Sequence, residues 1–311
     1  MDGIGKNYAD IPFAELKDII TNDKVLTAMS IAWKLGGETD ELMVPLRKIR
    51  WRPSNTVDYG VYAGGIGLGK NGPESLEAFF SLIERVAKLT GGGKGKIDDE
   101  ALDGLKKVIK ELGLNGSETV ARNKAKGAAE TIALILNKTA DGHTIKRIEA
   151  RSDILLPDGV TRRRYYDVEI EIDGVIVKYE VKAWVPKNIK EYLFKQFKGQ
   201  KVEDELTQIR TDLVKAMEES LVDGSIKNVD KITHRLLFDA RVGDGVTKQD
   251  IIDDFLDKLE AEPTLLESFI KQTKNEKLIN RLDMEEEKEK LIGELGKLLD
   301  KYIEINKKVS I

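Results

Sequence analysis

A β-hairpin signal in the middle of the chain constrains the fold more than any other feature. Asp173-Gly174 separates two alternating runs, residues 165–172 and 175–184, which is typical of a two-residue turn between antiparallel strands. Counting outward from this turn places Asp167 opposite Glu180. Because successive side chains point to opposite faces of a strand, Lys182 shares the face of Glu180.

The two faces of this hairpin are expected to differ. One face is predicted to be buried and carries Val168, Ile170, Ile172, Val175, Val177, Tyr179 and Val181. On the other face two carboxylates would repel each other, so the pairing predicts a cation between them, and oxygen ligands suit Mg²⁺. The same repulsion predicts that Glu180→Gln raises the melting temperature in metal-free buffer. The alternative is an ordinary solvated face with Glu169 and Lys178 as an ion pair.

The combination of Asp167 with Glu180-Val181-Lys182 resembles the active centre of the PD-(D/E)XK nuclease superfamily. In that family an acidic residue precedes a Glu-x-Lys segment at the end of a hairpin. The literal Pro-Asp pair here is Pro157-Asp158, which belongs to the turn before the hairpin. At about 3.3 Å per residue, Asp158 would lie roughly 30 Å along the strand from Asp167. Geometry therefore favours Asp167 as the family's first acid.

The order of elements expected for that family can also be followed in this chain. Its core runs helix, three antiparallel strands, helix, strand. Matching periodicities predict a helix at 117–138, a strand at 145–156, the hairpin at 160–184, a helix at 201–219 and a closing strand at 233–242. We therefore expect an α+β fold, with a restriction-endonuclease-like α-βββ-α-β core at 97–242. Mostly helical regions would flank it at 1–96 and 243–311.

The resemblance implies a metal-dependent active site. Asp167, Glu180 and the carbonyl of Val181 would hold Mg²⁺, or Mn²⁺, and Glu130 of the first helix would reach the ion directly or through water. The ion would polarise a phosphodiester and lower the pKa of the attacking water. Lys182 would orient that water and offset developing charge, while Gln208 would assist from the second helix. The expected enzyme is a Mg²⁺-dependent endonuclease with low sequence specificity.

Basic residues on both sides of the hairpin are the expected contacts for nucleic acid, with DNA favoured over RNA. They are Arg162, Arg163, Arg164, Lys187, Lys190, Lys195 and Lys198. Such residues bind phosphates without reading sequence. Tyr192, Phe194 and Phe197 lie among the lysines and could stack on bases. The alternative is a solvated helix whose aromatic side chains belong to the core.

Composition excludes several other kinds of site. The chain of 311 residues has no cysteine, which excludes disulfides and thiolate metal sites, and its two histidines, His143 and His234, are interpreted as structural. No apolar run approaches the length of a membrane span. The segment Gly64 to Lys70 matches a phosphate-binding Gly-x-x-x-x-Gly-Lys loop, but Asn71 replaces the required hydroxyl residue. We interpret it as a plain turn.

Both ends of the chain are predicted to be helical. Periodicity indicates N-terminal helices at 13–20, 24–35, 73–89 and 98–112, and Gly91 to Gly95 is interpreted as a flexible linker. Residues 247–311 are expected to be wholly helical, with apolar stripes such as Leu291, Leu295, Leu298 and Tyr302. These stripes are expected to pack on the body of the protein. If exposed, they would form a dimer or partner surface.

The helical leader and the core also resemble the nuclease domains at the ends of bacterial polymorphic toxins. That resemblance implies delivery from another cell as part of a larger secreted protein, action in the target cytoplasm, and an immunity protein as partner. Two alternatives belong to other classes of protein. One is a nuclease-like fold that binds nucleic acid or a partner without cutting, and the other is a helical interaction protein in which the hairpin has no chemical role.

Overall fold

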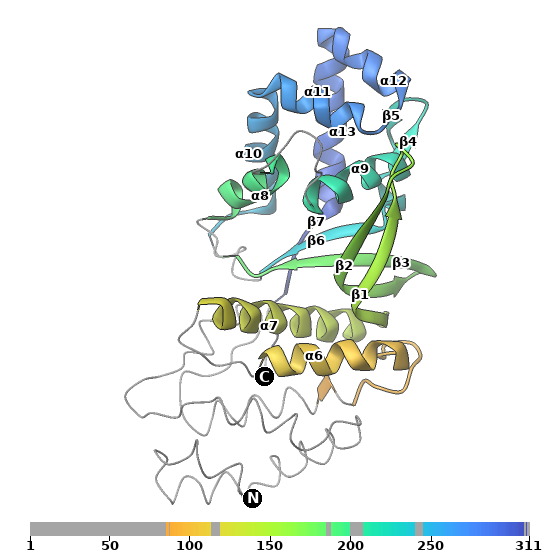
Figure 1. Ribbon diagram of the computed structural model, residues 1–311, viewed down its shortest axis with the longest axis vertical. Coiled ribbons are helices and arrows are strands. Elements are labelled where there is room, and N and C mark those ends of the chain that lie inside the picture. The colour runs from red at the N-terminus through yellow and green to blue at the C-terminus, as the bar shows by residue number, and fades with distance from the viewer. Residues whose placement is uncertain are drawn as a thin grey trace, which may run out of the picture. The chain divides into compact units, whose positions relative to one another are not determined.

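The structure is a computed structural model that describes residues 85–86, 88–112, 119–184, 188–199, 208–239, 245–307 and 309. It has an α+β architecture with a mixed five-stranded sheet flanked by helices (Figure 1). The chain forms two compact units, and each is described by itself. The helices predicted at 13–20 and 24–35, most of the helix predicted at 73–89, and the Gly64 to Lys70 segment lie outside the described residues.

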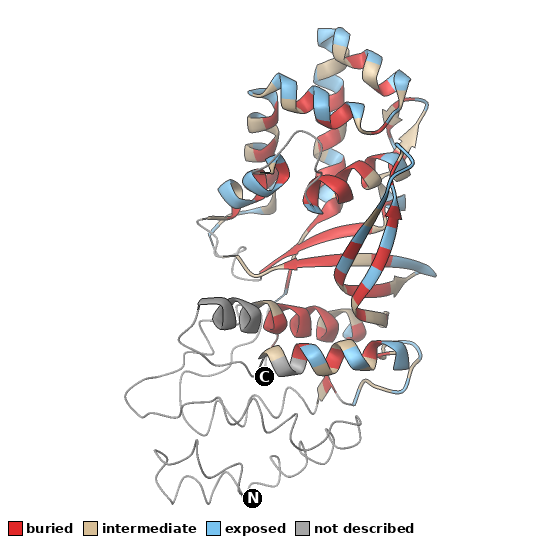
Figure 2. Ribbon diagram, in the orientation of Figure 1, coloured by how far each residue is buried: buried red, intermediate tan, exposed pale blue. Residues whose placement is uncertain are grey.

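The central sheet has the strand order β1-β2-β3-β6-β7. Its strands are β1 (Thr144–Leu155), β2 (Thr161–Ile172), β3 (Val175–Lys182), β6 (His234–Phe238) and β7 (Ile303–Ile305). β6 pairs in parallel with β3 on one side and with β7 on the other. β6 is buried along its whole length, His234 and Arg235 included (Figure 2), and its last three residues are apolar, which fits a central parallel strand.

The predicted turns around β2 are confirmed. Asp173 and Gly174 both have positive φ, 51° and 79°, which is the signature of the two-residue type I′ turn. Before β2, Asp158 Oδ1 accepts a hydrogen bond of 2.8 Å from the Val160 N–H. The prediction of a wholly buried apolar face is wrong at its ends: Val175 is 49% exposed and Ile172 is only half-buried. Both flank the tip of the hairpin, where few neighbours can cover them.

The first unit contains the predicted first helix. A short 3₁₀ turn, Asp99–Ala101, leads into α6 (Leu102–Leu112), which packs against α7 (Thr119–Ala140). The Gly91 to Gly95 segment was expected to be a flexible linker but is a hydrogen-bonded turn. Gly92 N–H donates to the Ile97 carbonyl and Lys96 N–H donates to the Gly93 carbonyl, both at 3.1 Å. The glycines supply positive φ values rather than freedom.

The second unit contains helices that pack beside its part of the sheet. They are α8 (Ile189–Lys198), α9 (Gln208–Ser220), α10 (Lys248–Glu260), α11 (Pro263–Lys271), α12 (Glu276–Ile279) and α13 (Glu285–Tyr302), with short strands β4 (Leu221–Val222) and β5 (Ser225–Ile226). Thr247 and Asp250 form a capping box that starts α10. Pro263 occupies the first turn of α11.

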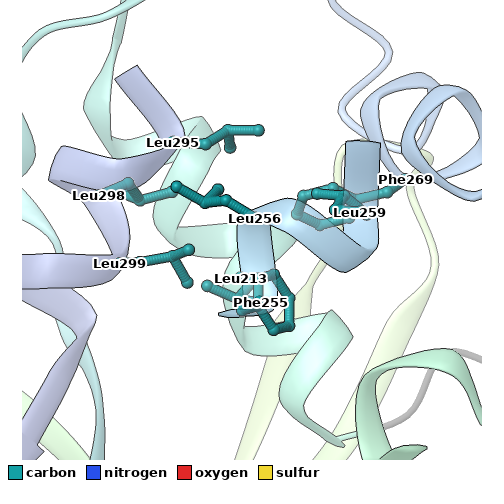
Figure 3. Close-up of a pocket in the computed structure, with 8 residues that line it drawn as sticks. All are labelled: Leu213, Phe255, Leu256, Leu259, Phe269, Leu295, Leu298 and Leu299. Atoms are coloured by element: carbon teal, nitrogen blue, oxygen red, sulfur yellow. The ribbon is translucent and has the colours of Figure 1, made fainter. Parts of the chain in front are cut away.

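The apolar stripes of the C-terminal helices are buried in the core of this unit, as predicted. A small gap remains between α9, α10, α11 and α13, and its lining consists only of leucine and phenylalanine side chains (Figure 3). The prediction that residues 247–311 are wholly helical is wrong at the end. Ile303–Ile305 forms β7, because its alternating β-branched residues suit a strand and the edge of β6 offers a partner.

Candidate active site

Three of the predicted catalytic side chains lie together in the second unit. Lys182 Nζ donates to Glu180 Oε1 at 2.5 Å. Gln208 is the first residue of α9, and its amide satisfies both neighbours when the nitrogen donates to Glu180 Oε1 at 3.1 Å and the oxygen faces Arg164. Glu180 is 6% exposed, whereas Gln208 is exposed at the surface of the cluster. The cluster therefore opens to solvent on the side of α9.

Asp167 lies beside the same segment of β3. Its Oδ2 accepts a hydrogen bond of 2.6 Å from the backbone N–H of Val181, the residue between Glu180 and Lys182. The end of β3 is fixed further by β6, because Asp239 N–H donates to the Lys182 carbonyl at 3.1 Å. The first acid and the Glu-x-Lys segment are thus neighbours. The hydrogen bond from an amide to an ionised carboxylate is of the stronger, charge-assisted kind.

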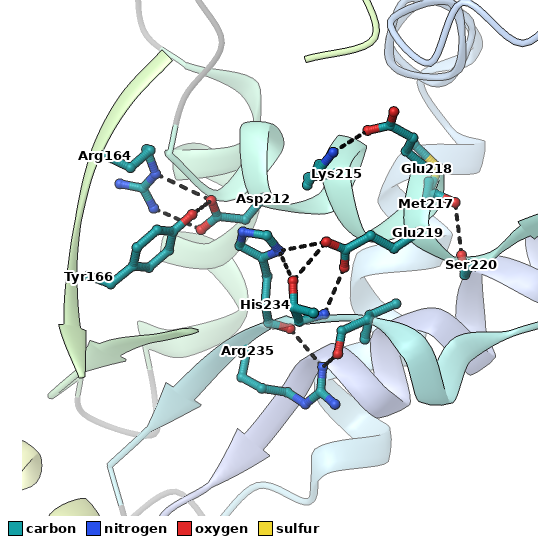
Figure 4. Close-up of polar contacts among 12 residues, drawn as sticks. Arg164, Tyr166, Asp212, Lys215, Met217, Glu218, Glu219, Ser220, His234 and Arg235 are labelled. Carbon is teal, nitrogen blue, oxygen red and sulfur yellow. Dashed lines mark hydrogen bonds and ion pairs between the residues drawn. The ribbon is translucent and has the colours of Figure 1, made fainter. Parts of the chain in front are cut away.

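Arg164 occupies a place different from the predicted nucleic-acid surface. It is 4% exposed, and its Nη2 and Nε donate to Oδ2 and Oδ1 of Asp212 at 2.7 and 3.2 Å (Figure 4). The Tyr166 hydroxyl donates to Asp212 Oδ1 at 2.9 Å. Alternate residues of β2 face α9, which brings Arg164 and Tyr166 to Asp212. An arginine buried in this way cannot contact a phosphate in solution.

The carboxylates of Asp212 and Glu180 each lie beside a cation, and the surroundings shift the pKa values of Arg164 and Tyr166. Burial opposes the positive charge of Arg164, but Asp212 and Glu180 together raise the pKa of its guanidinium above the ordinary value. Burial, followed by the charge of Asp212, raises the pKa of the Tyr166 phenol, so this hydroxyl keeps its proton and remains a donor. Two cations, Arg164 and Lys182, thus face two carboxylates, Asp212 and Glu180.

Sequence reasoning did not find Asp212, although a signal for it existed. Asp212 follows Ile209, which is buried, by three residues, and residues at this spacing share a face of a helix. Arg164 and Tyr166 likewise have the same parity as Val168 and Ile170, which are buried in the structure. A charged residue in phase with a buried face indicates a buried ion pair, and that signal was available for both partners.

Glu130, the predicted contribution of the first helix, is described in the first unit. It is fully buried on α7, and the side-chain amide of Asn306 donates to both its Oε2 and its backbone carbonyl at 3.0 Å. Small residues surround it in the sequence Gly-Ala-Ala-Glu. Its role as a metal ligand stays a prediction.

The basic residues after β3 are placed on or near α8. Lys187 lies outside the described residues, Lys190 is half-buried, and Lys195 and Lys198 are exposed and pair with Glu191 and Glu262. Of the residues before Arg164, Arg162 is half-buried and Arg163 is exposed.

The aromatic residues of α8 follow the alternative interpretation. Phe194 and Phe197 are buried in the core, so the prediction that they stack on bases is wrong. They occupy the inner face of an amphipathic helix. Tyr192 is 41% exposed and contacts Trp184 edge to face. Only Tyr192 of the three could meet a base.

The donor atoms at the site suit a hard cation. Asp167 and Glu180 offer carboxylates and Val181 a carbonyl, whereas no group of three His, Cys, Asp or Glu side chains with the geometry for a metal occurs in the described part of the chain. Mg²⁺ commonly uses one or two protein carboxylates and completes its shell with water and substrate phosphate. Carboxylate and carbonyl oxygens are the kind of donor that magnesium and manganese use, whereas zinc sites are built mainly from histidine and cysteine.

Comparisons with protein-family models, with curated proteins and with solved structures gave no match. Among the described helices, none combines the length and the apolar character that crossing a bilayer requires. The function is therefore argued from the site and from the order of the elements around it.

Proposed function

We propose that this protein is a metal-dependent nuclease that hydrolyses phosphodiester bonds, with a restriction-endonuclease-like core. The observation that carries the proposal is the meeting of Glu180, Lys182 and Gln208, with Asp167 hydrogen-bonded to the residue between the first two. The element order supports it. α7 is followed by β1, β2 and β3, then by helices, and then by β6 in parallel beside β3.

Each side chain has a role that its surroundings allow. Asp167 and Glu180, with the Val181 carbonyl, would hold Mg²⁺. When bound, the ion would polarise the phosphoryl group and activate the attacking water. Lys182 is 16% exposed at its side chain and could orient that water. Gln208, exposed at the start of α9, lies where a phosphate could approach. These residues would contact metal and phosphate rather than base edges, which supports the proposal of low sequence specificity.

The test uses the purified full chain with plasmid DNA and, separately, with structured RNA. We expect degradation in Mg²⁺ or Mn²⁺ that EDTA stops and that Asp167→Ala and Lys182→Ala abolish. The matched control is Lys215→Ala, which removes a lysine of α9 that pairs with Glu218 instead. All variants should give the far-UV circular dichroism of the wild type. Intact DNA and RNA under every metal tried would refute the proposal.

A second readout is independent of cleavage. Binding of Mn²⁺ to the protein without nucleic acid, followed by electron paramagnetic resonance, should be lost in Asp167→Ala and kept in Lys215→Ala. If the protein retards nucleic acid in native gel electrophoresis but does not degrade it, the protein binds nucleic acid without cutting it. In that case the cluster around Glu180 would be a structural ion network.

A further inference from the structure

Arg164 connects three elements through one buried guanidinium group. From β2 it reaches Asp212 on α9 through Nε and Nη2. With the Gln208 amide in the orientation that satisfies both of its ends, Arg164 Nη1 donates to the amide oxygen at 2.6 Å. Its Nη2 also lies 3.7 Å from Glu180 Oε2 on β3. All three guanidinium nitrogens are thus engaged. Because the group is planar and rigid, fixing Nε and Nη2 on Asp212 also fixes the direction of the third nitrogen, Nη1.

This third nitrogen decides which way the amide of Gln208 points. An amide has one accepting and one donating end, so accepting from Arg164 at the oxygen turns the nitrogen toward Glu180. Glu180 Oε1 then receives both Gln208 and Lys182, at 3.1 and 2.5 Å. Without Arg164, Gln208 would be an exposed side chain at a helix start with no fixed orientation.

We propose that Arg164 is a positioning residue, clamped by Asp212, that sets the orientation of Gln208 and through it that of the Glu180 carboxylate. The inference rests on the proposed function only in assigning Glu180 to a metal. Arg164 itself, at 4% exposed, does not touch substrate. Partners of a ligand commonly set its direction, and removing them typically weakens metal binding about 10–100-fold.

The decisive variant is Arg164→Lys, which keeps the positive charge but loses the planar guanidinium group with its several fixed donors. A lysine can reach Asp212 or Gln208 but not both in this geometry. The first readout needs no metal: the side-chain amide signal of Gln208 in a ¹⁵N correlation spectrum, assigned by its absence in Gln208→Ala. We expect this signal to move toward the position of a solvent-exposed amide. Mn²⁺ affinity should fall about tenfold.

Tyr166→Phe is the matched control, because it removes a hydroxyl from Asp212 but leaves every hydrogen bond of Arg164. The Gln208 signal and the Mn²⁺ affinity should both be retained. Gln208→Ala is the second variant, which also covers the case in which Arg164→Lys fails to fold, since Gln208 is exposed. It should weaken Mn²⁺ binding as much as Arg164→Lys does. The protein that carries both substitutions should bind Mn²⁺ as tightly as either single variant.

The outcomes separate the two proposals. An unmoved Gln208 signal in folded Arg164→Lys, or full Mn²⁺ affinity in Gln208→Ala, overturns the positioning role of Arg164. A moved signal in a protein whose wild type binds no Mn²⁺ supports the positioning role and counts against the nuclease.

Discussion

The buried pair of Arg164 and Asp212 gives the sharpest prediction for stability. The substitution Asp212→Asn keeps the shape of the side chain but leaves the guanidinium without its carboxylate. Arg164 and Asp212 are 4% and 1% exposed and share two hydrogen bonds. Breaking a buried pair by removing one partner costs about 3–5 kcal/mol. Glu180, 3.7 Å away, still offsets part of the charge, so the lower end, about 3 kcal/mol, is expected.

The size of this effect makes it easy to measure. Domains are stable by only about 5–15 kcal/mol, and each kcal/mol shifts the melting temperature by roughly 2–4 °C at this size. Asp212→Asn should therefore melt about 10 °C lower and unfold at lower urea. Tyr166→Phe, which removes one hydrogen bond to the same carboxylate, should cost only about 1 kcal/mol. An Asp212→Asn protein within about 1 kcal/mol of wild type would refute the buried-pair reasoning.

The remaining predictions concern glycines, a tyrosine and an acid. Gly104→Ala should destabilise by about 1–3 kcal/mol in denaturant titrations, because its Cβ would meet the Ile148 carbonyl oxygen at 2.0 Å. Gly293→Ala, with nothing within 4 Å, should stabilise α13 by about 0.5–1 kcal/mol; a loss in the same titration would contradict this. Tyr302→Phe should not lower the melting temperature, because its buried hydroxyl has no hydrogen-bond partner among the described residues. Burial opposes the charge of Glu219, but the His234 ring, 3.7 Å away, and two hydrogen bonds from Thr233 lower its pKa in the folded state below the ordinary value of 4.5. The stability it adds is present above about pH 4.5 and is lost as pH falls through the folded pKa, so Glu219→Gln should flatten stability against pH in that range.

Local patterns predicted much of the fold. The Asp173-Gly174 turn and the strands on either side follow from the local rules for two-residue hairpins. Strict alternation does not hold along β2, because Val168, Glu169 and Ile170 are all buried. The helix at 98–112 and the buried stripes of the C-terminal helices follow from periodicity in the same way. Strand β7 could not be predicted, because three residues acquire strand structure only from the open edge of β6, which is distant in sequence.

Only part of the candidate site was predicted from the sequence, and its electrostatics were predicted less well than its members. Glu180, Lys182 and Gln208 were expected to meet, and the structure brings them together. The sequence argument predicted repulsion between Asp167 and Glu180 because it did not include the cations near Glu180. Lys182 and Arg164 both lie near Glu180. Because Glu180→Gln removes the negative charge that these two cations face, the structure predicts that it lowers the melting temperature. The partner missing from the sequence argument was Asp212, which draws Arg164 inward.

The parallel pairing of β6 with β7 has a consequence for how the protein is made. β6 ends at residue 238 and β7 begins at residue 303, so during synthesis the β7-facing hydrogen-bonding edge of β6 stays uncovered while some sixty further residues are added. Exposed edges of this kind promote association between nascent chains. Substitutions that weaken β7 (Ile303–Ile305) should therefore reduce the yield of soluble protein from the cell. The specific activity of the molecules that do fold should fall less.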